Sequence, residues 1–349
     1  MPNQEFSING QQISPGRRMT IDLPVPKLYT HTETTMPVHV VRGRKDGPRL
    51  FVCAAIHGDE INGIEIIRRL LKYGGLKRMA GTLVAVPIVN VYGIIHHSRY
   101  LPDRRDLNRS FPGSESGSLA ARLAYLFMQQ IVSQCTHGID LHTGAVHRVN
   151  LPHIRANLDH PETERLARVF GVPVLLNSSF RDGSLRQSAD EAGIPILLYE
   201  AGEALRFDEL FIRAGVEGIK NVMRGLGMLP LTRRWQEKLA EPFVAHSSAW
   251  IRAPESGMLR TLIALGAHVQ NNDLLGMISD PFGETEVEIR AQINGVVIGR
   301  THLPLVNEGD ALFHIARFGK KGKFVAKHVE DFNQEHQAVI ENANEPPII

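Results

Sequence analysis

One unbroken apolar run, Leu50–Ile56, constrains the fold of this chain more than any other feature. A strand that is apolar at every position is buried on both faces, which is typical of the inner strands of a parallel sheet. Apolar residues then recur at steps of three and four from Ile61 to Leu71, and Gly74-Gly75 ends that pattern. This spacing indicates a helix directly after the strand. The pair predicts a strand followed at once by a helix.

The same alternation continues along the chain. Apolar strands are expected at residues 81–87, 138–142, 172–176 and 194–199, and a second helix at residues 119–132. Such alternation predicts an α/β fold with a mixed, largely parallel sheet flanked by helices. Alternating pieces such as Met36–Val41 indicate edge strands. We therefore expect residues 1–46 to pack as an N-terminal extension on a main domain of residues 47–240.

Residues 241–318 differ in character, because helical periodicity disappears and an internal repeat can be aligned. Ile251–Leu259 aligns with Ile289–Val297 at an offset of 38, and Val269, Asp273, Leu275 and Ile278 align with Val306, Asp310, Leu312 and Ile315 at an offset of 37. Two copies of one β unit are implied. The repeat resembles the biotinyl and lipoyl carrier domains, which are all-β barrel-sandwiches of two interlocked halves. The carrier lysine would lie in the hairpin Ser279–Glu284, which has no Lys, so we expect a capping domain.

Charge and composition exclude several classes of partner. Lys plus Arg total 39 and Asp plus Glu 37, and the charges are scattered, so we expect no nucleic-acid binding. No window approaches about 18 consecutive apolar residues, so we expect no membrane partner. Met1–Gly10 lacks a basic region followed by an apolar stretch, and with only two cysteines we expect a cytoplasmic protein. Residues 319–349 open with the basic run Gly319–Lys323 and are expected to be a solvated linker-like tail, while a homo-oligomer is left open.

Three candidate metal ligands lie at the ends of predicted strands. His57 and Glu60 are three residues apart after the first buried strand, and His142 ends another strand. Alone, a His-x-x-Glu pair is a weak signal and is more often a surface salt bridge. The position at strand ends, where open α/β sheets bind ligands, favours a metal site. Two His and one Glu suit one zinc ion with a position open for water, which is the arrangement of a catalytic site.

Further polar residues are expected around these ligands. Asp140 precedes His142 by two strand positions, so it either orients that imidazole or pairs only locally. The stretch Arg99–Arg109 contains four arginines, which predicts recognition of an anion, although some of them fit a solvated loop face equally well. Glu200 ends another buried strand and is placed to accept and return a proton.

Four of these pieces, in this order, resemble the succinylglutamate desuccinylase and aspartoacylase family of the zinc metallocarboxypeptidase-like superfamily. They are His57-Gly58-Asp59-Glu60, Asp106-Leu107-Asn108-Arg109, Asp140-Leu141-His142 and Glu200-Ala201-Gly202. The resemblance covers roughly residues 35 to 317. It implies a zinc amidohydrolase with one zinc ion per chain, which removes the acyl group from a small N-acyl amino acid or related N-acyl amine by attack of zinc-activated water.

The resemblance also implies a role for each matching residue. It implies that His57, Glu60 and His142 are the zinc ligands and that Glu200 is the general base. Asn108 and Arg109 would bind the substrate carboxylate, and Arg99 would polarise the scissile carbonyl. Arg186 would be a further substrate-binding arginine.

Two other functions remain as alternatives. A metallocarboxypeptidase for short peptides would use the same ligands and the same carboxylate grip. A non-catalytic binding module would require a degenerate site, whereas every predicted ligand and the base are present. The other histidines, namely His96, His97, His147 and His153, are expected to be loop or surface residues rather than ligands.

Overall fold

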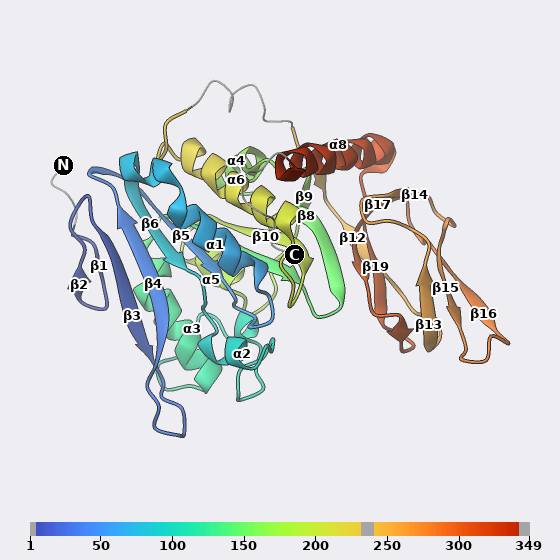
Figure 1. The fold of residues 1–349 in the computed structure, drawn as a ribbon, viewed down its shortest axis with the longest axis horizontal. Coiled ribbons are helices and arrows are strands. Elements are labelled where there is room, and N and C mark those ends of the chain that lie inside the picture. Colours follow the sequence, from blue (N-terminus) through green and yellow to red (C-terminus); the bar gives the residue numbers. More distant parts are fainter. Residues whose placement is uncertain (1–4, 232–240, 342–349) are drawn as a thin grey trace.

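The computed structural model describes residues 5–231 and 241–341. The chain forms one long twisted sheet with helices on both faces, and at one end this sheet runs into a small β-sandwich (Figure 1). The boundary expected at residue 240 lies outside the described residues, so the division of the chain at that point stays a prediction.

The centre of the long sheet is parallel. β5 (Lys45–Ala54), β6 (Ala80–Val86), β7 (His137–Gly144) and β10 (Ile196–Glu203) run parallel in the order β10-β7-β5-β6. Next to β6, β4 (Thr34–Arg42) and β3 (Arg18–Val25) are antiparallel, and next to β10, β8 (Arg148–Ala156) is antiparallel and pairs with the parallel β9 (Val174–Asn177). The apolar run of β5 is fully buried, as its sequence predicts. The mixed, largely parallel sheet is confirmed.

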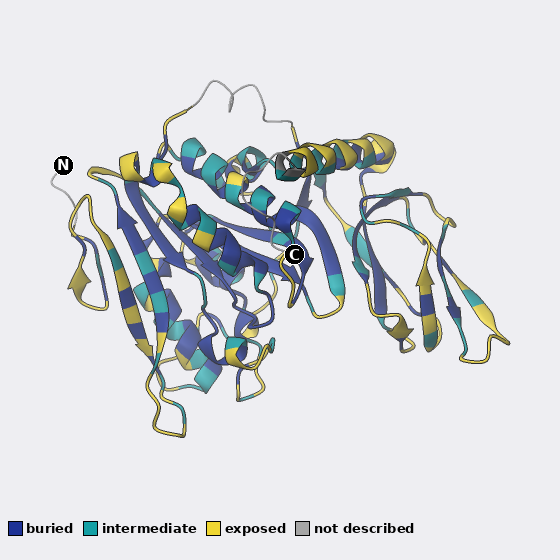
Figure 2. Cartoon of the chain, viewed as in Figure 1, coloured by how far each residue is buried: buried dark blue, intermediate teal, exposed yellow. Residues whose placement is uncertain are grey.

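Helices cover both faces of this sheet, so its central strands β6, β7 and β10 are almost wholly buried (Figure 2). On one face lie α1 (Asn62–Lys72), α4 (Pro161–Phe170) and α6 (Glu209–Gly225), and on the other α3 (Leu119–Gln130), α5 (Leu185–Glu191) and the short α2 (Val91–Ile95). Ser118 begins α3 by accepting a hydrogen bond from the N–H of Ala121, and Gly171, at φ 95°, ends α4. Shorter elements are β1 (Ser7–Ile8), β2 (Gln11–Gln12), η1 (Gly74–Arg78), η2 (Leu107–Arg109) and η3 (Val132–Gln134).

The internal repeat corresponds to two sets of four strands. The first set is β12 (Ser248–Arg252), β13 (Gly257–Thr261), β14 (His268–Val269) and β15 (Leu274–Ser279), and the second is β16 (Glu286–Arg290), β17 (Gly295–Thr301), β18 (Leu305–Val306) and β19 (Ala311–Ala316). Equivalent strands have equivalent partners: β12 pairs with β19 and β16 with β15, and β14 pairs with β17 and β18 with β13. Each sheet of the sandwich therefore contains strands of both copies, and the halves interlock. Kinship with the carrier domains stays a prediction.

The sandwich is joined to the long sheet by two strand pairs. β17 pairs antiparallel with β8 through Gly299–Thr301, and β11 (Phe243–Ala245) pairs parallel with β9. Strands β12, β19 and β17 thus extend the long sheet rather than forming a separate body.

The segment after the sandwich differs from the expected tail. Its basic run enters η4 (Gly319–Lys321), and α8 (Gly322–Glu341) follows. Val325 and Val329, four residues apart on one helix face, are buried against Val296 and Phe318. The expectation of a linker is wrong for residues 319–341, because these apolar side chains dock the helix.

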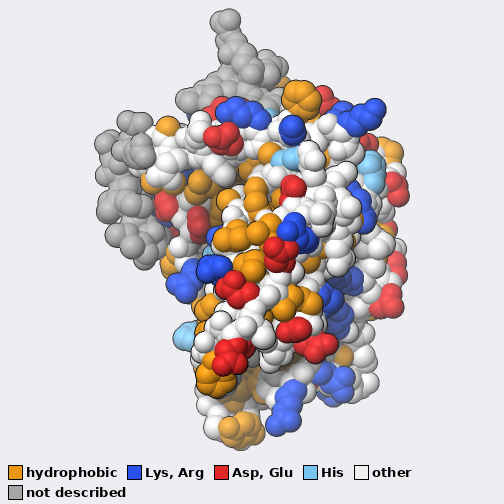
Figure 3. Space-filling model, turned by 90° about the vertical axis from the view of Figure 1, so that its right-hand side faces the viewer, with side chains coloured by type: hydrophobic (Ala, Val, Ile, Leu, Met, Phe, Trp, Pro, Cys, Tyr) orange, Lys and Arg blue, Asp and Glu red, His pale blue; other side chains and the backbone are white. Residues whose placement is uncertain are grey.

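The end of the molecule formed by the sandwich carries mixed charge. Figure 3 shows Lys and Arg interspersed there with Asp and Glu, with no single basic patch on this face. Among the described residues, no helix is both long and apolar enough to cross a bilayer.

Candidate active site

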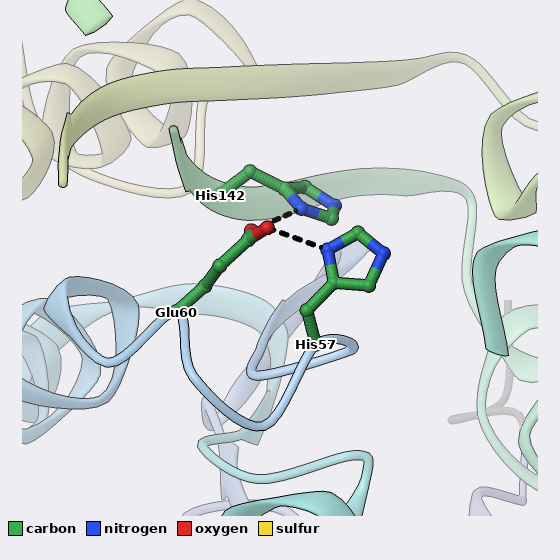
Figure 4. A group of neighbouring side chains, drawn as sticks. All are labelled: His57, Glu60 and His142. Atoms are coloured by element: carbon green, nitrogen blue, oxygen red, sulfur yellow. Dashed lines mark hydrogen bonds and ion pairs between the residues drawn. The ribbon is translucent and has the colours of Figure 1, made fainter. Parts of the chain in front are cut away.

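The predicted ligands meet where two neighbouring parallel strands, β5 and β7, end. His57 and Glu60 lie in the turn between β5 and α1, and His142 lies near the end of β7. Figure 4 shows the Glu60 carboxylate between the two imidazole rings. The carboxyl ends of adjacent parallel strands share one edge of the sheet, so residues 82 positions apart in sequence become neighbours.

The geometry of these three side chains suits a metal ion. Glu60 Oε1 lies 2.7 Å from His57 Nδ1, and Glu60 Oε2 lies 2.7 Å from His142 Nδ1. One ligand atom from each residue falls within 4.8 Å of the others, and all three residues are buried. Two imidazole nitrogens and one carboxylate form the donor set of a catalytic zinc site, which leaves one position open. These residues therefore fit zinc.

Two further carboxylates contact the Nε2 atoms of the two imidazoles, on the side away from Glu60. Asp106 Oδ1 lies 3.1 Å from His57 Nε2, and Asp140 Oδ2 lies 2.8 Å from His142 Nε2. With Nε2 engaged in this way, Nδ1 of each ring is the nitrogen available to a metal. Asp140 makes the contact that its predicted orienting role requires. The equivalent role of Asp106 was missed, although Asp106 stands in one of the recognised motifs.

Electrostatics keep the central carboxylate ionised. Burial would raise the pKa of Glu60, but His57 and His142 lower it well below its usual range. Burial works in the opposite sense on His142, whose pKa is nevertheless raised by Asp140 and Glu60. Acidic neighbours that make an imidazole more basic also make it a stronger metal ligand.

Arg99 reaches the edge of this group. Its Nε and Nη2 donate to Asp106 Oδ2 at 3.2 and 2.9 Å, and its Nη1 lies 3.3 Å from Glu60 Oε1. The guanidinium is fixed by Asp106 and faces the pocket beside the ligands. Its position is compatible with contact to a carbonyl bound at the metal, and that role stays a prediction.

Asn108 and Arg109 lie in η2, next to the loop that precedes α5. Asn108 Oδ1 accepts a hydrogen bond of 2.9 Å from the N–H of Leu185, so its amide NH₂ is the end that can meet a carboxylate. Arg109 donates to the carbonyl of Asn108, and both residues line the pocket. A side chain at Gly183 would approach the carbonyl of Arg109 to 2.6 Å, so this glycine allows the loop and η2 to lie close together.

Glu200 faces the ligands from β10. Its Cα is the register partner of His142 on β7, and its side chain lines the same pocket. Asn150 on β8 donates from Nδ2 to Glu200 Oε2 at 2.9 Å. Asn150 was not predicted, because polar residues and Pro152 interrupt the apolar pattern of β8.

The pocket has a volume of about 520 Å³ and is rich in arginine. Seven arginines line it in the described part of the chain, namely Arg99, Arg109, Arg148, Arg155, Arg181, Arg186 and Arg252, against the acidic Glu60 and Glu200. Arg186 donates to the carbonyls of Ser178 and Ser179 at 2.9 and 2.7 Å, so the structure uses it to hold this loop. Burial, followed by Arg155 and Arg181, lowers the pKa of Arg186 to about 10.

The β-sandwich forms one wall of the pocket. Trp250, Arg252, Ala311 and His314 all line it. The Trp250 ring stacks on His314 with centroids 4.6 Å apart and an interplanar angle of 7°, and the guanidinium of Arg148 lies 5.5 Å from the Trp250 centroid. The site is therefore completed by the second half of the chain.

His153 departs from its expected surface position. It is fully buried in β8, opposite Glu200, and donates from Nδ1 to the carbonyl of Leu151 at 2.7 Å. Burial and then Arg155 lower its pKa to about 4, against the opposing effect of Glu200. His96, His97 and His147 are exposed, as predicted.

Comparisons with known proteins agree with this arrangement. The family model of the succinylglutamate desuccinylase/aspartoacylase catalytic domain matches residues 46–226. An N-alpha-acetyl-L-2,4-diaminobutyric acid deacetylase from Halomonas elongata is 27% identical over 295 residues, which is 80% of this chain and 85% of that protein.

Solved structures share the fold over nearly the whole chain. A succinylglutamate desuccinylase/aspartoacylase from Rhodobacter sphaeroides has a TM-score of 0.78 and 23% identity, covering 89% of this chain and 99% of that one. The product-bound ectoine utilization protein EutE (DoeB) from Ruegeria pomeroyi has a TM-score of 0.80 and 23% identity, covering 90% and 99%. The catalytic-domain match extends over more than half of the sequence and contains all the predicted ligands. The chain belongs to the succinylglutamate desuccinylase/aspartoacylase family.

Proposed function

We propose that this chain is a zinc-dependent deacylase, which hydrolyses the amide bond of a small N-acyl amino acid or related N-acyl amine. One observation carries the proposal: a buried His57, Glu60 and His142 group opens onto a pocket that also contains Glu200. The family and the deacetylase relative from Halomonas elongata support the same reaction class. A cytoplasmic location is part of the proposal.

The residues of the chain divide the work of hydrolysis. Zinc, when held by the three ligands, supplies a Lewis acid that polarises a carbonyl and lowers the pKa of water. Glu200 takes the proton of the attacking water and returns it to the leaving amine. Arg99 donates to the carbonyl oxygen as negative charge develops there. Asn108 and Arg109 hold the substrate carboxylate, which brings the amide carbon into register with Glu200.

The charge of the pocket supports a substrate that bears carboxylate. Arginine is the side chain best suited to bind carboxylates through two parallel hydrogen bonds. Arg155 has a buried Nε without a hydrogen-bond partner, and no described residue forms an ion pair with its guanidinium. Burial lowers the pKa of Arg155 and the charge of Glu200 offsets this only in part, so a substrate anion bound near Arg155 would reduce the cost of burying its charge. We therefore expect anionic N-acyl amino acids to be better substrates than N-acyl amines without a carboxylate.

The pocket walls disfavour the peptidase alternative. Trp250, Ala311 and His314 of the sandwich line the same pocket as the metal ligands, so we expect the sandwich to restrict the space for a longer chain. A panel of N-acyl amino acids, dipeptides and longer peptides separates the two functions. Release of amino acids from the longer peptides would contradict the walled-site proposal.

The first test measures the zinc content of the protein and then its activity. Elemental analysis of wild type purified with zinc supplied should find about one zinc per chain, and His57→Ala/His142→Ala should lose it, because two of three ligands are gone. The exposed pair His96→Ala/His97→Ala is the matched control and should keep its zinc. Amine release from the panel then identifies the substrate. A wild type that takes up no zinc would refute the ligand set and the enzyme with it.

A further inference from the structure

Asn150 lies at the junction between the catalytic sheet and the β-sandwich. It is 8% exposed, and its strand β8 lies between β10, which carries Glu200, and β17, which belongs to the sandwich. Asn150 is the register partner of Gly202 on one side and of Gly299 on the other. Asn150 therefore lies between the strand that carries Glu200 and the sandwich strand that carries Gly299.

A β-bulge aims this side chain at Glu200. Glu200 on β10 pairs with His153 on β8, but Gly202 on β10 pairs with Asn150 on β8. Between these two pairs β10 advances by two residues and β8 by three, so β8 contains one extra residue. The extra residue falls next to Pro152, which cannot donate to a strand ladder. Without the bulge, Leu151 would lie opposite Gly202. Bulges beside active sites commonly redirect a side chain in this way.

Gly299 of the sandwich provides the space that the Asn150 amide occupies. A Cβ at position 299 would lie 2.8 Å from Asn150 Oδ1, which is closer than a carbon and an oxygen normally approach. β17 also shifts register between Val297 and Gly299, whereas the equivalent strand β13 pairs with β15 without any shift. The β unit can therefore fold without this register shift. The shift occurs in β17, in the copy of the repeat that contacts Asn150.

We propose that Asn150 is a positioning residue for the catalytic base, and that Gly299 of the β-sandwich holds Asn150 in place. The Nδ2 hydrogen bond of 2.9 Å fixes Glu200 Oε2 and leaves Oε1 to face the attacking water. A hydrogen bond to a charged group is stronger than a neutral one and restricts the carboxylate to one orientation. This inference rests on the proposed function, because it assigns Glu200 the role of base.

The kinetic test is a double-mutant cycle on the most active substrate. Asn150→Ala should lower kcat about 10-fold or more with KM within about twofold, since only proton transfer loses its alignment. Gly299→Ala should lower kcat in the same way by displacing the Asn150 amide. In the Asn150→Ala background, Gly299→Ala should change kcat by less than about twofold, because no amide remains to be displaced. Zinc content should stay at the wild-type level in all variants.

Gly74→Ala is the matched control, because an added methyl group there meets nothing within 4 Å. Its kcat should equal that of the wild type. A wild-type kcat in Asn150→Ala, or fully additive losses in the double variant, would overturn the inference and leave the deacylase function standing.

Crystal structures of the wild type and Gly299→Ala give a readout that needs no activity. We expect the Asn150 amide to move and the Glu200 carboxylate to change orientation in the variant. An unchanged contact between Asn150 and Glu200 would overturn the inference. If the wild type releases amine from no substrate, the proposed function fails, and this structural comparison alone decides whether Gly299 and Asn150 position Glu200.

Discussion

Replacing Glu200 by Gln tests the core of the proposed chemistry with a minimal change of shape. The substitution removes the ability to accept a proton and keeps the length of the side chain. The oxygen of a Gln amide can still accept the hydrogen bond that Asn150 now donates at 2.9 Å. Glu200 is outside the His57, Glu60 and His142 group, so metal binding should be unaffected.

The expected loss follows from the role of a positioned base. General acid–base catalysis contributes about 10² to 10⁴ in rate, which corresponds to about 3 to 5 kcal/mol of barrier height. Because the contact to Asn150 can be retained, we expect little change in the free energy of unfolding. KM should also change little, since the proposal assigns binding of the substrate carboxylate to Asn108 and Arg109, not to Glu200.

The assay is steady-state amine release, together with zinc content and the unfolding midpoint. Glu203→Gln is the matched control: Glu203 lies on the same strand, binds His302 Nδ1 at 2.7 Å, and does not line the pocket. Its kcat should stay near the wild-type value. A Glu200→Gln enzyme with near-normal kcat and full zinc would refute the assignment of the base.

Three further predictions follow from the buried groups. Because His153 has a pKa of about 4 when folded and 6.5 as a free side chain, the unfolded chain binds more protons between these values. Stability should therefore fall by up to about 3 kcal/mol as pH drops from 6.5 to 4; urea unfolding should show less of this fall in His153→Gln, and an equal fall would contradict it. Asp140→Asn should weaken zinc binding about 10- to 100-fold in a chelator competition; unchanged affinity would argue against its orienting role. Val329→Ala should lower the free energy of unfolding by about 2 kcal/mol, and no loss would mean that α8 docks without this contact.

The parts of the fold that were predictable share one physical property. β5 is covered by helices on both faces, so it is apolar throughout and stands out in the sequence. The sandwich was predictable because its core positions occur twice: Ile251 and Ile289 are both buried in one core, as are Leu275 and Leu312. In these regions, burial alone determines the pattern of residues.

β8 was not predicted, because one of its faces forms the pocket instead of the core. Asn150 and Arg155 on this strand line the pocket, and Pro152 interrupts the apolar pattern. A strand that presents polar groups to a ligand loses the pattern by which strands are found. The same cause explains why His153 was expected on the surface and why the partner of Glu200 was missed. The ligands were easier to find because they occupy the ends of apolar strands.

The relation between the two copies of the repeat indicates what the sandwich contributes. Their strand pairing within the sandwich is equivalent, but only β17 gains a further partner, β8, in the catalytic sheet. The corresponding strand β13 pairs with β15 and β18 and, among the described residues, with no other strand. A domain that only covered the pocket would not need to break the symmetry of its repeat. The asymmetry lies at Gly299, against the side chain that binds Glu200, which supports the proposal that the sandwich helps to position the base.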